Sequence, residues 1–471
     1  MKHIPEETKL TTKDIFVSIV SASENNLKLQ NFIKEDNEEP VQLCKLHDFF
    51  TGNFELSKIT SLHLQNCDIS NLPRDVQKLN LKQLILNHNK LKEVPSCLYS
   101  GLEMLEVLDL SHNLIETFDI EPACSHNIVS LKLSYNKIYN FPHWIMTCHC
   151  PKLIEIDYSA NFLRSVNLPH KLSIKKLQMN NSQLLDVDFD FFKRIKTLEY
   201  LDVGNVVDKK LANNDNEFKD INKFFDKVKW KELKVLKLDH LLVSIIPEGL
   251  FWIVSLRELY LTYCDLSWIP REFQYLTNLK ILDVSHNSIC GIPQELSSLP
   301  NLTVVKAPFN IISSVADFAN DLQVLDLYHN QLETFPNSIE QIEFIDLEQN
   351  YVDMSLHKSY ETYGRKLNSF RQMLDDERTE GPKALPKESI IEPDYISSDG
   401  SVCQNHDFYD EDVLNERWDY EESVSVDRNR NPEITPSDDE WNGKEETIIK
   451  EKRTVKPWID VNEDWIFSDV E

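Results

Sequence analysis

The chain has 471 residues, of which 50 are Lys or Arg and 78 are Asp or Glu, so its formal charge at pH 7 is −28. This acidic balance argues against nucleic acid as a partner, because phosphate binding needs a basic surface. No stretch approaches the roughly 18 apolar residues of a membrane span, and none follows the opening "MKHIPEETKL". We therefore expect no membrane insertion and no secretion, and place the protein in the cytoplasm, with the nucleus as an alternative.

The nine cysteines are an odd number scattered along the chain, and they favour reduced thiols. The stretch "HWIMTCHC" brings together His143, Cys148, His149 and Cys150, but its C-x-C spacing is not that of the common zinc modules. A plain loop is the preferred interpretation. We expect no metal and no cofactor.

Residues 1–56 contain "DIFVSIV" and then "VQLCKLHDFF". In the second stretch Leu43, Leu46, Phe49 and Phe50 fall at helical spacing, which predicts a helix with one apolar face. We interpret residues 1–56 as an N-terminal cap for the segment that follows.

Residues 57–352 repeat the frame L-x-x-L-x-L-x-x-N-x-L about thirteen times. The second apolar anchors of the frames are Leu62, Leu84, Leu108, Leu131, Ile156, Leu177, Leu201, Leu236, Leu259, Leu282, Val305, Leu325 and Ile345. Successive anchors are 20 to 25 residues apart, except for one step of 35 that marks an insertion at 208–230. Such a period is typical of solenoids, whose units bury their apolar faces only by stacking.

Alternation within the frame predicts a short strand. In "SLHLQ" Leu62 and Leu64 point inward, whereas Ser61, His63 and Gln65 point outward. A Pro often follows the frame and suits the first position of a short helix. The array resembles the leucine-rich repeat family, and the resemblance implies an α/β solenoid: a horseshoe with a parallel sheet on its concave face.

The Asn of the frame can bond backbone groups of its own turn and of the next. Eight repeats keep it: Asn89, Asn113, Asn136, Asn161, Asn287, Asn310, Asn330 and Asn350. Cys67 and Cys264 fill the position elsewhere, as the family accepts. Ser182, Val206 and Leu241 occupy it in consecutive repeats, so we expect an irregular ladder there.

The insertion at 208–230 places Phe218, Ile221, Phe224, Phe225 and Val228 on one helical face. This helix could bind a partner, but we favour a helix folded back on the convex side. Residues 353–374 predict an amphipathic capping helix. Residues 375–471 carry 29 acidic against 11 basic residues, and we expect a disordered acidic tail.

The outward positions of the strands are free to vary, and in the later repeats they bring rings and charges together. Such a surface is typical of binding sites. The predicted partner-binding residues are Tyr260, Tyr263, Asp283, His286, Lys306, Phe309, Asp326, Tyr328 and His329. The opposing interpretation is that "LDLSHN" is a common spelling of this frame, with no specific role for its Asp and His.

Three tail tryptophans, Trp418, Trp441 and Trp465, are each embedded in acidic residues. Isolated rings in an acidic chain suit docking into grooves, and these stretches resemble the tryptophan-acidic peptides read by kinesin light chains. An inert solubilising tail is the alternative.

No phosphate-cradling loop, nucleophile elbow or His-Glu-x-x-His helix occurs, so we expect no enzyme activity. The "IP" spelling and the period near 23 resemble the intracellular Ras-group (Ras-suppressor-like) repeat proteins. That resemblance implies a scaffold that binds proteins, in small-GTPase or phosphatase signalling. The alternative is an acidic-tailed repeat protein that chaperones or regulates basic, nuclear client proteins.

Overall fold

A computed structural model of the chain divides into two units, residues 1–384 and 385–471. The described residues all belong to the first unit. They are 59–383 together with the backbone of three earlier strands, without 148–149, 164–171, 186–191, 193, 208–210, 212–213, 228–229, 319–321, 335–339, 354, 356–357, 373 and 375–377.

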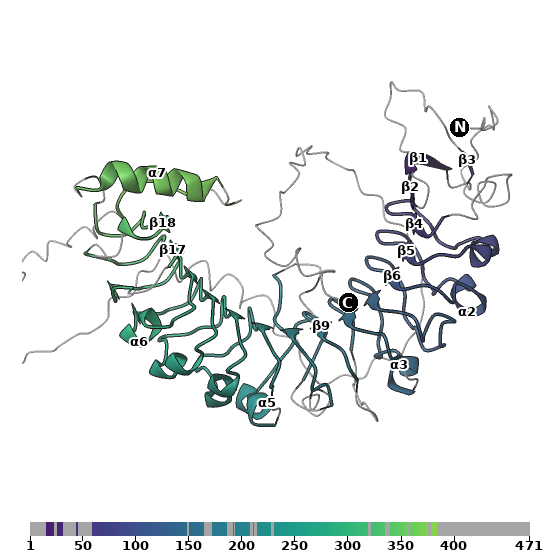
Figure 1. The fold of residues 1–471 in the computed structure, drawn as a ribbon, viewed down its shortest axis with the longest axis horizontal. Helices are drawn as coiled ribbons and strands as arrows, with labels where there is room; N and C mark the ends of the chain where they lie inside the picture. The colour runs from purple at the N-terminus through teal and green to yellow at the C-terminus, as the bar shows by residue number, and fades with distance from the viewer. Residues whose placement is uncertain are drawn as a thin grey trace, which may run out of the picture. The chain divides into compact units, whose positions relative to one another are not determined.

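Thirteen short parallel strands, one for each predicted repeat, form the inner side of an arc (Figure 1). They are β4 (Ser61–His63), β5 (Gln83–Ile85), β6 (Val107–Asp109), β7 (Ser130–Lys132), β8 (Glu155–Asp157), β9 (Lys176–Gln178), β10 (Tyr200–Asp202), β11 (Val235–Lys237), β12 (Glu258–Tyr260), β13 (Ile281–Asp283), β15 (Val304–Lys306), β17 (Val324–Asp326) and β18 (Phe344–Asp346). Anchor lies opposite anchor throughout, as Leu62 lies opposite Leu84 and Leu259 opposite Leu282. The predicted fold class, an α/β solenoid with a parallel sheet on its concave face, is confirmed.

The N-terminal segment continues the same sheet. Strand β2 (Asn26–Asn31) pairs in parallel with β4, and β1 (Phe16–Ala22) pairs antiparallel with both β2 and β3 (Cys44–Lys45). The helix predicted from Leu43 to Phe50 is therefore wrong at Cys44 and Lys45. Backbone pairing to β1 outweighs the helical spacing there, because spacing alone does not report on an available strand partner.

Short helical turns lie on the outer side of the arc (Figure 1). They are η2 (Arg74–Lys78), α2 (Cys97–Ser100), α3 (His143–Thr147), α5 (Ile221–Lys227), η5 (Glu248–Trp252), η6 (Arg271–Tyr275) and α6 (Gln294–Ser297). Five of them begin directly after a proline. In η2, η5, η6 and α6 this proline has φ between −60° and −72° and is the N-cap residue, not the first helical residue. A second sheet pairs β14 (Gly291–Ile292) with β16 (Ser314–Val315).

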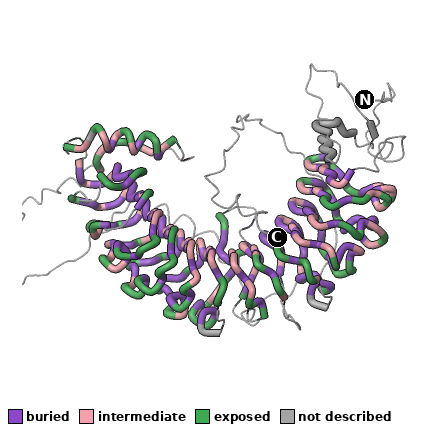
Figure 2. The backbone as a smooth tube through the Cα atoms, in the orientation of Figure 1, coloured by how far each residue is buried: buried purple, intermediate pink, exposed green. Residues whose placement is uncertain are grey.

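The core is one apolar column between the strands and the outer turns, purple in Figure 2. The anchors Leu62, Leu131, Leu259 and Leu325 are all 0% exposed. Each repeat buries its face only against its neighbours, so the column is continuous from Ile59 to Leu367.

The asparagines of successive repeats form a ladder of hydrogen bonds between their side chains and the backbone. These bonds explain why this position of the frame favours asparagine. Asn89 accepts hydrogen bonds of 3.0 Å from the N–H groups of Cys67 and Ile69, and its amide donates to the carbonyls of Leu64 and Leu86. These backbone groups are buried, and leaving one unpaired costs about 1–3 kcal/mol.

The ladder is more regular around the insertion than the sequence predicted. Asn216, inside the insertion, accepts from the N–H groups of Ser182 and Leu184 and donates to the carbonyls of Met179 and Val203. The first part of the insertion therefore precedes the asparagine of this repeat, which is Asn216, and Val206 does not occupy that position. The overlooked signal was the spacing Asn216-Glu217-Phe218, which matches the end of the frame.

The remainder of the insertion folds onto the outer side. In α5 the side chains of Ile221, Phe224 and Phe225 are at most 7% exposed, and Phe224 contacts Phe192 and Trp230 edge-on or tilted. These apolar side chains therefore pack in the core, as expected for a helix folded back on the convex side. The predicted Val228 lies outside the described residues.

The C-terminal end of the array is closed by α7 (Tyr360–Arg371), a shorter helix than the predicted 353–374. Its residues Tyr363 and Phe370 are 1% exposed, and the Tyr363 hydroxyl donates to Glu348 at 2.8 Å. Residues 378–383 also lie against the last repeats, and we call them the C-terminal strap. The first unit therefore extends past the predicted tail boundary at 375, to residue 384.

Candidate functional site

The concave face carries the outward residues of the strands, and the alternation predicted from the frame is observed. In β12 Leu259 is fully buried while Glu258 and Tyr260 on either side are half-buried. The later repeats therefore present Tyr260, Asp283 and Lys306 side by side, because β12, β13 and β15 pair in register.

The aspartates of the middle outward row have a structural task. In each of six repeats the carboxylate accepts a hydrogen bond from the backbone N–H two residues later. The pairs are Asp109 with Ser111, Asp157 with Ser159, Asp202 with Gly204, Asp283 with Ser285, Asp326 with Tyr328, and Asp346 with Glu348. This bond fixes the turn after the strand, so an Asp at this position is explained without any ligand.

Burial affects the charge of these carboxylates. Desolvation raises the pKa of Asp202 to about 6, although Lys237 opposes the shift, and desolvation also raises the pKa of Asp283. With a pKa of about 6, Asp202 is mostly ionised at neutral pH, and Lys237 and Lys306 partly offset the desolvation of Asp202 and Asp283, respectively.

A row of rings lies just after the strands, and its members stack on one another. Centroid distances are 4.3 Å for His240 and Tyr263, 4.2 Å for Tyr263 and His286, 4.4 Å for His286 and Phe309, and 5.1 Å for Phe309 and His329. All five residues have φ near +55°, so the same left-handed turn aims each ring in the same direction. The stack leaves Tyr263 46% exposed.

An earlier stack repeats the arrangement. His88, His112 and Tyr135 lie 4.0 and 4.2 Å apart, again with φ above +50°. Burial and the neighbouring His88 lower the pKa of His112, against the effect of Asp109 and Asp157. The two stacks are separated by repeats with Ala160 and Asn181 at this position, which have no ring to continue them.

Two residues beside the later stack were missing from the predicted site. Lys237 Nζ lies 4.9 Å from the ring centre of Tyr260 and 5.8 Å from that of Tyr200. A cation over aromatic faces contributes about 0.5–1 kcal/mol at an exposed site. Lys237 occupies the same outward row as Tyr260, and this was the signal available in the sequence; Tyr200 belongs to the row beside it.

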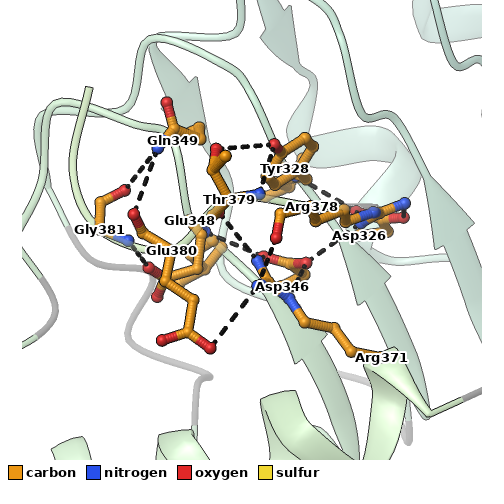
Figure 3. A network of polar contacts seen from close by, with 12 residues as sticks. Asp326, Tyr328, Asp346, Glu348, Gln349, Arg371, Arg378, Thr379, Glu380 and Gly381 are labelled. Carbon is orange, nitrogen blue, oxygen red and sulfur yellow. Dashed lines mark hydrogen bonds and ion pairs between the residues drawn. The ribbon is translucent and has the colours of Figure 1, made fainter. Parts of the chain in front are cut away.

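The nine predicted residues divide into two groups. Tyr260, Tyr263, Asp283, His286, Lys306, Phe309 and His329 lie together and are half-buried or exposed. Asp326 and Tyr328 are 2% and 5% exposed, because the C-terminal strap covers them (Figure 3). The predicted surface was therefore too long at its C-terminal end, since the sequence gives no sign that residues 378–383 return to the sheet.

The covering contacts form one polar network (Figure 3). Arg378 Nη1 and Nη2 each lie 2.9 Å from an oxygen of Asp326, and Nη1 also lies 3.1 Å from Asp346. Arg371 pairs with Asp346 at 3.1 Å, and the Tyr328 hydroxyl accepts from the Thr379 N–H at 3.2 Å. Burial raises the pKa of Asp326 to about 6 while Arg378 opposes the shift, so the pair is charged at neutral pH.

Other predicted positions lie outside this part of the structure. Trp418, Trp441 and Trp465, and likewise Cys148 and His149, are not among the described residues. Within the described ranges no group of three or more His, Cys, Asp or Glu is arranged to hold a metal ion. In the same ranges no helix has both the length and the apolar character needed to cross a membrane.

Comparison with known proteins agrees with this geometry. The profile described as "Leucine rich repeat" matches residues 57–115 and 79–138, and a second of the same description matches 255–276, 278–299 and 321–342. Fibromodulin of Oryctolagus cuniculus is 30% identical over 135 residues, which are 28% of this chain and 85% of that protein. The chain belongs to the leucine-rich repeat proteins. Leucine-rich repeats mediate protein–protein interaction.

Two further matches differ in how much of the other protein they cover. The "Leucine-rich repeat-containing G-protein coupled receptor 5" of Rattus norvegicus is 34% identical over 149 residues, 30% of this chain but only 16% of the receptor. A solved leucine-rich repeat protein of Leptospira interrogans is 24% identical with a TM-score of 0.49, and covers 62% of this chain and 73% of that one. The finer resemblance to the Ras-group repeat style is not carried by these matches and stays a prediction.

Proposed function

We propose that this leucine-rich repeat protein is a non-catalytic scaffold that holds a protein partner on its concave face, over strands β10 to β15. The observation that carries the proposal is the partly exposed ring stack beside Lys237 and Tyr260. Stacked rings are already ordered in the free protein, so a partner that covers them loses little side-chain entropy there.

The charges of the same patch favour a partner with mixed surface chemistry. The middle outward row carries negative and positive side chains on both sides of the aromatic ring of Tyr260. In order its residues are Asp202, Lys237, Tyr260, Asp283 and Lys306. The Tyr260 hydroxyl donates to Glu258 at 3.0 Å and keeps the ring fixed. Such a patch selects its partner by complementary charge and gains affinity from the rings.

The test compares two pairs of aromatic replacements in the full chain. Tyr260→Ala/Tyr263→Ala removes concave rings, whereas Trp252→Ala/Tyr275→Ala removes outer-side rings that are 80% and 55% exposed. Captured proteins should be lost with the concave pair and kept with the outer pair, with affinity falling about thirtyfold for about 2 kcal/mol at an anchor. Equal capture by both variants would move the binding site off the ring stack.

The proposed compartment and pathway of the scaffold rest on the sequence alone. We place the scaffold in the cytosol, in small-GTPase or phosphatase signalling, because its "IP" spelling and period resemble the Ras-group repeats. Tagged full-length protein and identification of the captured partner would test both statements. A partner from neither class would refute the pathway while leaving the concave site in place.

The alternative function, a chaperone or regulator of basic nuclear client proteins, is favoured by the net charge of −18 over residues 375–471, from 29 acidic and 11 basic residues. Binding of this kind depends strongly on salt, because it is electrostatic. A partner held by the ring stack should instead survive moderate salt. Titrating NaCl against each captured complex separates the two functions.

A further inference from the structure

The C-terminal strap places an arginine in a formed site on the last two repeats. The side chain of Arg378 is 5% exposed, and those of its partners Asp326 and Asp346 are 2% and 0% exposed. The rest of the strap is more open, since Glu380 is 72% exposed and Thr379 is also exposed. Burial in this segment is therefore concentrated on one side chain.

The geometry of the site is specific for a guanidinium. Arg378 Nη1 donates to Oδ1 of Asp326 and Nη2 donates to Oδ2, each at 2.9 Å. The Arg378 Cζ lies 4.8 Å from the ring centre of Tyr328. A planar fork can pair with a carboxylate and stack on a ring at once, whereas a lysine ammonium is a point charge and cannot. The site distinguishes arginine from lysine by shape.

The strap backbone takes the place of a further repeat. Within the array the His329 N–H donates to the carbonyl of Glu348, one repeat later. The Gln349 N–H donates in the same way to the carbonyl of Gly381, and the Lys383 N–H donates to Asn350. Glu348 accepts from the Gly381 N–H, and Gly381 has φ +93°, a conformation that suits glycine.

The strap also shortens the concave surface. Tyr328 packs edge-on against Phe309, the penultimate ring of the later stack, with centroids 5.3 Å apart. Removing the strap would uncover Tyr328 beside that ring and lengthen the partner-binding surface by one repeat.

We propose that Asp326, Asp346 and Tyr328 form an arginine subsite of the concave face, which Arg378 fills in cis and which an arginine-bearing peptide of a partner fills in its place. The proposal deepens the proposed function by adding a recognition subsite to the same face. Vacating the subsite uncovers the Asp326 carboxylate and removes its bidentate guanidinium partner, since Arg371 serves Asp346. An incoming guanidinium restores both nitrogen contacts, which an ammonium cannot do, and this difference confers selectivity.

The experiment uses the full chain and a fluorescent peptide, LDDERTEGPKAL, that copies residues 374–385. The first host is the wild type. The second carries Arg378→Ala/Gly381→Pro, which removes the guanidinium and the Gly381 N–H. The third adds Asp326→Asn to the second. A peptide with Lys in place of Arg is the matched probe control, and fluorescence anisotropy gives each affinity.

The second host should bind the arginine peptide about tenfold or more tightly than the wild type, whose tethered strap competes at an effective concentration on the order of millimolar. Asp326→Asn and the lysine peptide should each abolish most of this gain. Equal binding to wild type and second host, or binding indifferent to Asp326→Asn, would overturn the proposal. So would absence of binding to a second host with an unchanged circular dichroism spectrum, because the strap would then be a permanent cap.

A milder variant keeps the proposal testable if the second host fails to fold. Arg378→Lys retains the charge but loses the bidentate pair, so its strap should compete less well and admit the arginine peptide better than the wild type does. Arg378→Lys binding no better than wild type would equally count against exchange. No partner is used in these measurements, so their failure is distinguishable from failure of the ring-stack test.

Discussion

The side chain of Asn216 accepts a hydrogen bond of 3.0 Å from the backbone N–H of Ser182, 34 residues earlier. This bond places the insertion within one repeat and keeps the asparagine ladder intact across it. Asn205 supports the arrangement, since its side chain accepts from the Asn216 N–H at 2.8 Å and donates to the Asn216 carbonyl at 3.2 Å.

Replacing this residue should destabilise the middle of the array. Asn216→Ala leaves the buried N–H groups of Ser182 and Leu184 unpaired, at a cost of at least about 2 kcal/mol. Asn222→Ala, on an exposed position of α5, should change the free energy of unfolding by less than about 0.5 kcal/mol. Urea unfolding measures both, and hydrogen exchange should quicken at Ser182 and Leu184. Equal stability of the two variants would contradict this role.

Two glycines should respond oppositely to alanine. A Cβ at Gly249 would lie 2.7 Å from Phe225 Cβ and 3.1 Å from its carbonyl carbon, so α5 must move, at a cost of about 1–3 kcal/mol. Gly364 lies within α7 with nothing within 4 Å of its added Cβ, so Gly364→Ala should stabilise by about 0.5–1 kcal/mol. Thermal and urea unfolding of the two variants test this. A Gly249→Ala protein as stable as wild type would show that α5 is not held against η5.

The earlier ring stack should make stability depend on pH. Burial and His88 lower the pKa of His112 in the folded state, so the folded chain favours the neutral ring. The stability contributed by this group is complete above the unfolded pKa of about 6.5 and is lost as pH falls below it. His112→Phe keeps a ring between His88 and Tyr135 but cannot be protonated. The wild type should therefore lose stability relative to this variant between pH 8 and pH 5.

The quantity compared is the difference in unfolding free energy between wild type and variant, because other groups titrate in the same pH range. The pKa of Asp202 is raised to about 6, so its contribution changes in the opposite direction over the same range and cancels between the two proteins. A wild-type minus variant difference that stays constant with pH would rule out His112 as the source.

The tail tryptophans remain a prediction about docking. Replacing Trp418, Trp441 and Trp465 together by Ala should remove the interactions of residues 385–471, whereas Trp458→Ala, in "VKPWID", should not. Capture with full-length variants measures this. Retention of every tail interaction by the triple variant would favour an inert solubilising tail.

Limited proteolysis tests the boundary of the folded unit. The sequence places the start of the tail at residue 375, but the strap is bonded to Asp326, Gln349 and Asn350. We expect the resistant fragment to extend to about residue 384 and cleavage to be rapid beyond it, as mass spectrometry of the fragment would show. A fragment that ends before Arg378 would show that the strap opens readily in solution.

The sequence by itself determined the repeat frame, the direction of each outward side chain and the ring row. These follow from local rules: strand alternation has a period of two, and a unit such as "LKILDVSHN" cannot bury its leucines without neighbours. Because Leu259, Leu282 and Val305 recur in register, the sheet and its concave surface could be predicted without coordinates.

Only the tertiary structure decided which of these outward residues are exposed. Asp326 occupies the same position of the frame as Asp283, yet Arg378 covers it from 52 residues further along the chain. Asn216 likewise completes a ladder from inside an insertion. Such long-range contacts depend on where the chain returns in space, and a repeat pattern constrains only neighbouring repeats. The array is therefore encoded locally, whereas the limits of the proposed binding surface are set by contacts that close the array at its end.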